Sequence, residues 1–156
     1  VNNTCYNNGV LKASGEIWVQ YSSNNMIMNN ILYAGGDTSN RAILIQSYES
    51  HGDIRNTYSN NLYFVKEGAN TRKLFLFHGK SYSSFDDFKR ETGQGEGSLF
   101  ADPRFKNPDG GEPDFSLESG SPALNRGADI PECGAEDLTG NRRIIGKIDM
   151  GALERQ

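Results

Sequence analysis

The chain has 156 residues, which is enough for one domain with a hydrophobic core and too few for two comfortable ones. Its apolar share is 35% and it holds 18 glycines, a balance that favours a turn-rich β protein with a narrow core. The formal net charge of -4 excludes an ordinary nucleic-acid-binding surface, because no basic stripe is present to neutralise phosphates. The short Arg142–Arg143 pair is expected in a solvated turn.

Targeting and cysteine signals are sparse. No apolar run reaches the roughly 18 residues of a membrane-spanning helix, so no membrane insertion is expected. The sequence opens on Val1 inside an asparagine-rich pattern, which we interpret as a cut from a longer protein. Cys5 and Cys133 lie near opposite ends without metal-ligand spacing. Free, partly buried thiols are the favoured interpretation, and a disulfide between the two stays the alternative.

The first half contains an internal repeat with two markers. One marker is a pair of asparagines followed by an apolar stretch, and it begins at Asn2, Asn29 and Asn60, at offsets of 27 and 31 residues. The other is a strand-like apolar stretch that ends at Gln20, Gln46 and His78, at offsets of 26 and 32 residues. Two markers that advance together argue against chance similarity.

These markers predict a parallel β-solenoid with one coil every 26–32 residues. Strands at 26–28 and 31–33 flank the middle asparagine pair, and asparagine tolerates the left-handed backbone of a sharp bend. Stacked strands lie roughly 4.8 Å apart, so asparagines at equivalent bends can bond along the stack as a ladder. A solvated loop is the alternative for the pairs, and no Trp-Asp or leucine-rich signature supports a propeller or a leucine-rich repeat.

Alternation along the second marker divides its side chains between two faces. The expected inward set is Ile17, Val19, Ile43, Ile45, Phe75 and Phe77. The expected outward set is Glu16, Trp18, Gln20, Leu44, Gln46, Leu76 and His78.

Trp18 is the only tryptophan, and on the outward face it is a candidate platform for stacking a sugar ring. The polar residues expected to contact a glycan with it are Glu16, Gln20, Gln46 and His78. The alternative is an apolar row of Trp18, Leu44 and Leu76 that the C-terminal segment covers.

A short helix is predicted at residues 84–93. Ser83 or Ser84 is the expected N-cap, acidic residues fall in the first turn, basic residues follow, and Gly93 ends the helix. Phe85 and Phe88 are three residues apart and are expected to face the solenoid. The remaining sequence is dense in turn signals, and a segment in this place is suited to cap the last coil and block edge-to-edge pairing.

Several motifs of the second half resemble a known family. They are SFDDF and TG at 84–88 and 92–93, SLFADPRF at 98–105, FSL at 115–117, GSPALNRG at 120–127, DLTGNRR at 137–143 and IDMGALE at 148–154. In this order and spacing they resemble the C-terminal region of bacterial right-handed parallel β-helix repeat proteins of the pectate-lyase-like superfamily. The resemblance implies an all-β, right-handed parallel β-helix. Its coils would occupy residues 1–82, and a short helix with an irregular C-terminal cap of the same domain would occupy residues 83–156.

The resemblance is weaker evidence for a particular chemistry. Similar β-helices include uronan lyases, glycoside hydrolases and epimerases, along with proteins without known activity, and their sites lie on the outer face of one sheet. It implies a bacterial protein that is secreted or at the cell surface, with an acidic or neutral polysaccharide as partner. No cofactor is evident and no zinc or calcium-loop spacing occurs, so calcium enters only through the resemblance.

Residues that could carry chemistry are scattered over the first half. The candidates for a lyase base or for a positive group facing a uronate are Lys12, Arg41, Lys66 and Arg72. Hydrolysis needs two carboxylates about 5–10 Å apart, for which the candidates are Asp37, Glu49 and Asp53. His51 and His78 have no matched partner in the sequence. A solvated surface position is the alternative for each of these side chains.

The leading hypothesis is the C-terminal part of a secreted polysaccharide-active protein, lyase-like or glycosidase-like, in which this chain is mainly structural and inactive alone. The alternative is a non-catalytic glycan-binding or adhesin-type surface solenoid, and a self-sufficient small enzyme comes third. The first coil exposes unpaired strands, so end-to-end self-association of the chain is expected.

Overall fold

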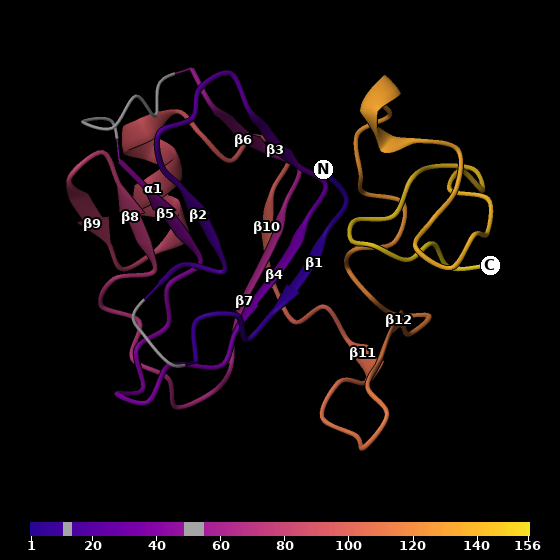
Figure 1. Cartoon of the computed structure of the whole chain (residues 1–156), viewed down its shortest axis with the longest axis horizontal. Coiled ribbons are helices and arrows are strands. Elements are labelled where there is room, and N and C mark those ends of the chain that lie inside the picture. Colours follow the sequence, from indigo (N-terminus) through magenta and orange to yellow (C-terminus); the bar gives the residue numbers. More distant parts are fainter. Residues whose placement is uncertain (11–13, 49–54) are drawn as a thin grey trace.

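The computed structural model of the chain describes residues 1–10, 14–48 and 55–156. Its strands stack as a parallel β-solenoid, because the chain visits three sheets in turn and then returns to the first (Figure 1). The first sheet joins β1 (Thr4–Tyr6), β4 (Ile31–Ala34), β7 (Leu62–Val65) and β10 (Leu99–Phe100), all parallel. The second joins β2 (Ile17–Val19), β5 (Ile45–Ser47) and β8 (Phe75–Phe77) in parallel, and adds β9 (Lys80–Tyr82) antiparallel to β8. The third pairs β3 (Met26–Met28) with β6 (Thr57–Ser59). The predicted parallel solenoid is confirmed.

In the second sheet the middle coil is shifted by two residues from the predicted alignment, in which Gln46 was level with Gln20 and His78. Trp18 lies beside Gln46 and Gln46 beside Leu76, so neither Gln20 nor His78 is a neighbour of Gln46 in the sheet. Leu44, which was expected to face outward, is fully buried in the core. The physical reason is that residues 42–44 precede β5 at a corner of the coil, where successive side chains do not alternate between two faces.

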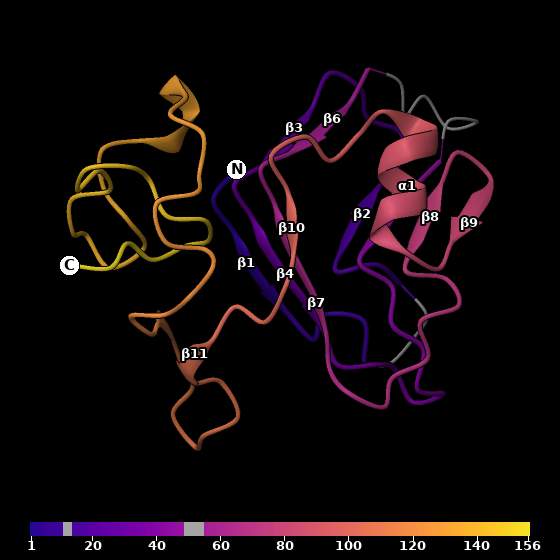
Figure 2. The ribbon, with the colours of Figure 1, turned by 180° about the vertical axis from the view of Figure 1, so that it is seen from behind.

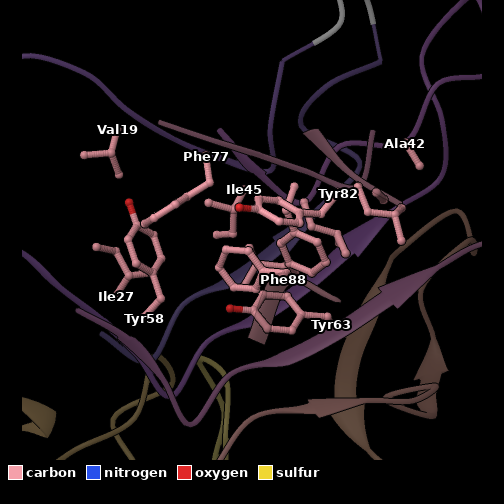
Figure 3. Packing of buried hydrophobic residues seen from close by; sticks show 14 residues of the cluster. Val19, Ile27, Ala42, Ile45, Tyr58, Tyr63, Phe77, Tyr82 and Phe88 are labelled. Carbon is pink, nitrogen blue, oxygen red and sulfur yellow. The ribbon is translucent and has the colours of Figure 1, made fainter. Parts of the chain in front are cut away.

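The core fills the space between the sheets with apolar side chains from every coil. Figure 3 shows this packing, in which Tyr63 and Phe88 lie close to Ile45 and Tyr58 lies nearer to Phe77. Aromatic rings dominate its C-terminal end, where Phe75 stacks on Phe88 with ring centroids 4.4 Å apart. A narrow core of this kind matches the low apolar content of the sequence.

The paired asparagines form the predicted ladder, and the two members of each pair have different structural roles. The first member of each pair has a positive φ, at Asn2, Asn29 and Asn60. The second members bond along the stack. Asn3 donates its backbone N–H to Asn30 Oδ1 at 2.9 Å, and Asn30 donates its own to Asn61 Oδ1 at 2.9 Å. The ladder ends where Asn61 donates its N–H to Ser98 Oγ at 3.0 Å. These side chains satisfy backbone groups at bends that no sheet covers.

Helix α1 (Phe85–Thr92) has the predicted caps and covers the last coil. Ser84 accepts a hydrogen bond from the N–H of Asp87, and Gly93 ends the helix in the left-handed conformation. Phe88 is fully buried against Phe75, Phe77 and Tyr82. Seen from behind in Figure 2, the helix lies between β10 and β8, over the C-terminal end of the core.

The rest of the C-terminal segment covers the side of the solenoid. It contains the antiparallel pair β11 (Phe105–Asn107) and β12 (Asp114–Leu117) and a 3-10 turn at Pro131–Cys133. Phe105, Leu117 and Met150 pack on the outward side chains of the first sheet, among them Ile31 and Leu62. The segment therefore lies on the flank of β1, β4 and β7 (Figure 1).

Two details of this segment bear on the sequence predictions. Arg143 is buried and donates to the carbonyls of Gly151 and Ala152, so its prediction as a solvated residue is wrong. Cys5 and Cys133 are both free thiols, as the sequence favoured. Among the described helices, none is long and apolar enough to cross a membrane.

Candidate functional site

The second sheet aligns three side chains in one row, one from each coil: Trp18, which is exposed, Gln46, which is buried, and Leu76, which is half-buried. Trp18 is 52% exposed, whereas its neighbours in β2 are half-buried at Ile17 and buried at Val19, as alternation along a strand requires. The C-terminal segment lies on the opposite flank of the solenoid, so it does not cover this row (Figure 1). The alternative was an apolar row covered by the C-terminal segment. It is wrong for Trp18, which is exposed, and for Leu44, which lies in the core and not on the outer face.

Gln46 is held in a fixed position between two neighbours. Its Oε1 accepts the backbone N–H of Gly15 at 3.2 Å, and its Nε2 donates to the hydroxyl of Tyr48 at 2.8 Å. The ring of Tyr48 lies beside Trp18, with centroids 6.4 Å apart and planes tilted by 59°. The rings of Trp18 and Tyr48 therefore lie side by side, and the buried amide of Gln46 is bonded to the Tyr48 hydroxyl. Flat aromatic faces with a polar edge are suited to stack against a sugar ring.

A basic pocket of about 220 Å³ adjoins this surface. Gln46, Tyr48 and Leu76 line its near side. Three cationic side chains, Arg41, Arg72 and Lys73, line it together with Asn70, and none of its described lining residues is a carboxylate. Arg41 is anchored, because its Nε donates to Asp37 Oδ2 at 2.9 Å and a terminal nitrogen lies 2.8 Å from the same oxygen.

Asp37 shapes the bend beside this pocket. Its Oδ1 accepts the backbone N–H groups of Ser39 and Arg41, at 2.8 and 2.9 Å. These hydrogen bonds, led by that from the Arg41 backbone, hold the pKa of the Asp37 carboxyl below its ordinary value. The residue is thus an ionised anchor for Arg41 and for the turn.

Glu16 is buried, although alternation placed it on the outer face. Its Oε2 accepts the backbone N–H of Asn8 at 2.8 Å, so it points toward the bend after β1 and away from the outer surface. Burial raises the pKa of its carboxyl to about 7. Glu16 and Asp37 line one cavity, but its volume of about 10 Å³ admits no sugar.

The other predicted site residues lie elsewhere. Gln20 is half-buried and lines the open N-terminal end of the solenoid, and His78 occupies the exposed turn between β8 and β9. Lys66 pairs with Asp109 at 3.6 Å beside the C-terminal segment. The remaining candidates, Lys12, Glu49, His51 and Asp53, lie outside the described residues.

Sequence reasoning missed Tyr48, Asn70 and Lys73. Tyr48 was accessible from the alternation, because it lies two residues after Gln46 and so shares its face. Asn70 and Lys73 lie in the bend before β8, whose path depends on contacts such as the N–H of Ala42 donating to the carbonyl of Asn70. No local pattern signals such a position.

Among the residues that the structure describes, no group of three or more His, Cys, Asp or Glu side chains is placed to hold a metal ion. A larger polar cavity of about 580 Å³ lies on the C-terminal segment, between β12 and the last residues. The carboxylate of Asp137, which lines this cavity, accepts hydrogen bonds from the backbone N–H groups of Thr139, Asn141 and Glu154. That carboxylate therefore serves the loop it belongs to.

Comparison with known proteins gives one partial match. Over 111 residues the chain is 35% identical to the uncharacterized protein YwoF of Bacillus subtilis strain 168. The matched region is 70% of this chain and 22% of YwoF, so the chain spans about a fifth of the length of the curated relative it matches. No family model matches, and no solved structure matches. The chain is thus similar to a stretch of a much longer bacterial protein.

Proposed function

We propose that this chain is the glycan-contacting C-terminal part of a polysaccharide-active β-helix protein, and that it binds glycan through the Trp18, Gln46 and Leu76 row. The motifs of residues 84–154 support the finer assignment, because they resemble the end of right-handed parallel β-helices of the pectate-lyase-like superfamily. On the same grounds we propose a protein that is secreted or at the cell surface.

The observation that carries the proposal is the exposed Trp18 beside Tyr48, with the buried Gln46 fixed between them. An amide whose two ends are already engaged costs little entropy to hold in place when a ligand arrives. Exposed aromatic rings give a glycan a large apolar contact while leaving its hydroxyls at the solvent.

Binding is favoured over catalysis by this chain alone. The carboxylates of Glu16 and Asp37 accept hydrogen bonds from backbone N–H groups, and both residues line a cavity that is too small for a sugar. A lyase-like role remains the second candidate, because Arg72 lines the pocket beside the row and is of a kind that can act as base. An assay that follows the formation of unsaturated uronate products by ultraviolet absorbance tests this second candidate, and product formation would support it.

The test is isothermal titration against a panel of soluble neutral and acidic polysaccharides, with the variant Trp18→Ala. We expect the affinity for the bound polysaccharide to fall about tenfold, since loss of a stacked ring removes roughly 1–1.5 kcal/mol. Leu138→Ala removes another exposed apolar side chain on the C-terminal segment and serves as the matched control. Unchanged affinity in Trp18→Ala, or no binding across the panel, would overturn the proposal.

A further inference from the structure

We infer that the basic pocket beside the row is an anion subsite, which takes a carboxylate or sulfate group of an acidic glycan. The inference rests on the proposed function, because it assigns the charge of the ligand that the Trp18 face binds. It adds to the Trp18 face a second group of residues, Asn70, Arg72 and Lys73.

The charge of the pocket carries the argument. In the part of the chain that the structure describes, no carboxylate forms an ion pair with Arg72 or Lys73, and both side chains are exposed. Arg41 is paired with Asp37, so among the described residues the two cations of the rim without a paired carboxylate are Arg72 and Lys73. This occurs in a chain of net charge -4, so the patch runs against the overall balance. A local field of this sign attracts anions despite the acidic surroundings.

The geometry limits the ligand to a group on a larger molecule. A volume of about 220 Å³ is small for a complete ligand site. Gln46, Tyr48 and Leu76 line the pocket and also belong to or contact the row, so a sugar stacked on Trp18 would direct a neighbouring unit toward Arg72 and Lys73. The Arg41 guanidinium, oriented by Asp37, is available to hydrogen-bond the same unit through its remaining nitrogen.

The experiment compares three polysaccharides by isothermal titration with the intact chain. Polygalacturonate presents carboxylates, its fully methyl-esterified form presents the same backbone without charge, and dextran sulfate presents sulfate esters. We expect polygalacturonate to bind at least tenfold more tightly than the ester, with an affinity that falls as salt rises. Tighter binding of dextran sulfate than of polygalacturonate would assign the subsite to sulfate.

The double variant Arg72→Gln with Lys73→Gln identifies the pocket. We expect it to lose at least tenfold in affinity for the charged polymers and to bind the ester as the wild type does. Lys89→Gln with Arg126→Gln makes the same change in net charge on α1 and on the C-terminal segment, and is expected to change nothing. Equal binding of polygalacturonate and its ester would overturn the subsite while leaving the Trp18 face intact, as would a double variant that behaves as wild type. No binding of any polymer would instead overturn the proposed function.

Discussion

Neighbouring residues at the start of the second sheet differ in burial, and the burial of Glu16 can be detected by its titration. Glu16 is two residues from Trp18, yet it is buried and its pKa is raised to about 7. The folded chain therefore binds this proton more tightly than the unfolded chain does, whose carboxyl keeps a value near 4.5. As the pH rises from about 4.5 to about 7, Glu16 lowers the free energy of unfolding, and above about 7 its effect is constant.

The variant Glu16→Gln removes this titration. We expect it to be more stable than the wild type by about 1–2 kcal/mol near pH 8, and to lose that advantage near pH 4.5. Urea unfolding at both pH values measures the difference. Asp37→Asn is the control of opposite sign, since a lowered pKa stabilises the ionised fold, and it should be less stable than the wild type near pH 7. A pH-independent difference for Glu16→Gln would contradict the account.

The residues of the candidate site were predictable only in part. Trp18 and Gln46 could be placed on the outer face because strands alternate. Glu16 lies before the first residue of β2, at the end of a bend, where that alternation no longer applies. The basic pocket was beyond local patterns, because its cations come from bends in two different coils.

At the scale of elements, the existence of the repeat was predictable and its register was not. The asparagine pairs mark the bends, and their hydrogen bonds from Asn3 to Asn30 and from Asn30 to Asn61 follow the predicted spacing. Residues 42–45 are all apolar and all buried, so the sequence offers no signal for where the corner ends and β5 begins. Pairing with β2 and β8 selects Ile45 as the first strand residue.

The docking of the C-terminal segment depends on a close approach at Gly151. A Cβ there would lie 2.8 Å from Ile31 Cδ1 and 2.9 Å from Thr4 Oγ1, and the φ of 98° is unfavourable for other residues. We expect Gly151→Ala to lower the free energy of unfolding by about 1–3 kcal/mol. Gly111→Ala is the matched control, since nothing lies within 4 Å of its Cβ. Urea unfolding compares the two, and equal stability would show that the segment is not packed as described.

At the scale of the whole molecule, the two ends of the solenoid differ. Helix α1 covers the C-terminal end with Phe88, whereas β1, β2 and β3 are edge strands at the other end. The three edge strands contain no charged residue, and a cavity of about 400 Å³ opens among them. Edges without charge are the ones that attract a second strand.

We therefore expect copies of this chain, when studied by itself, to associate weakly through the open end at high concentration. Two copies meeting there would bring the same end of each asparagine ladder together, which limits the strength of the contact. Light scattering over a concentration series measures the association. Met26→Lys places a charge on the edge strand β3 and should return the chain to a monomer, whereas Leu138→Lys on the C-terminal segment should not. A wild-type monomer at every concentration would contradict this expectation.

The central claim is that the Trp18 face binds glycan, and Trp18 allows a direct test because it is the only tryptophan of the chain. Its emission and its quenching by acrylamide should therefore report on this face without mutation, measured at low protein concentration to avoid self-association. The account predicts that a bound acidic polysaccharide shifts the emission to shorter wavelength and protects the 52%-exposed ring from quenching. Glycan binding that leaves both emission and quenching unchanged would place the binding surface elsewhere and contradict the claim.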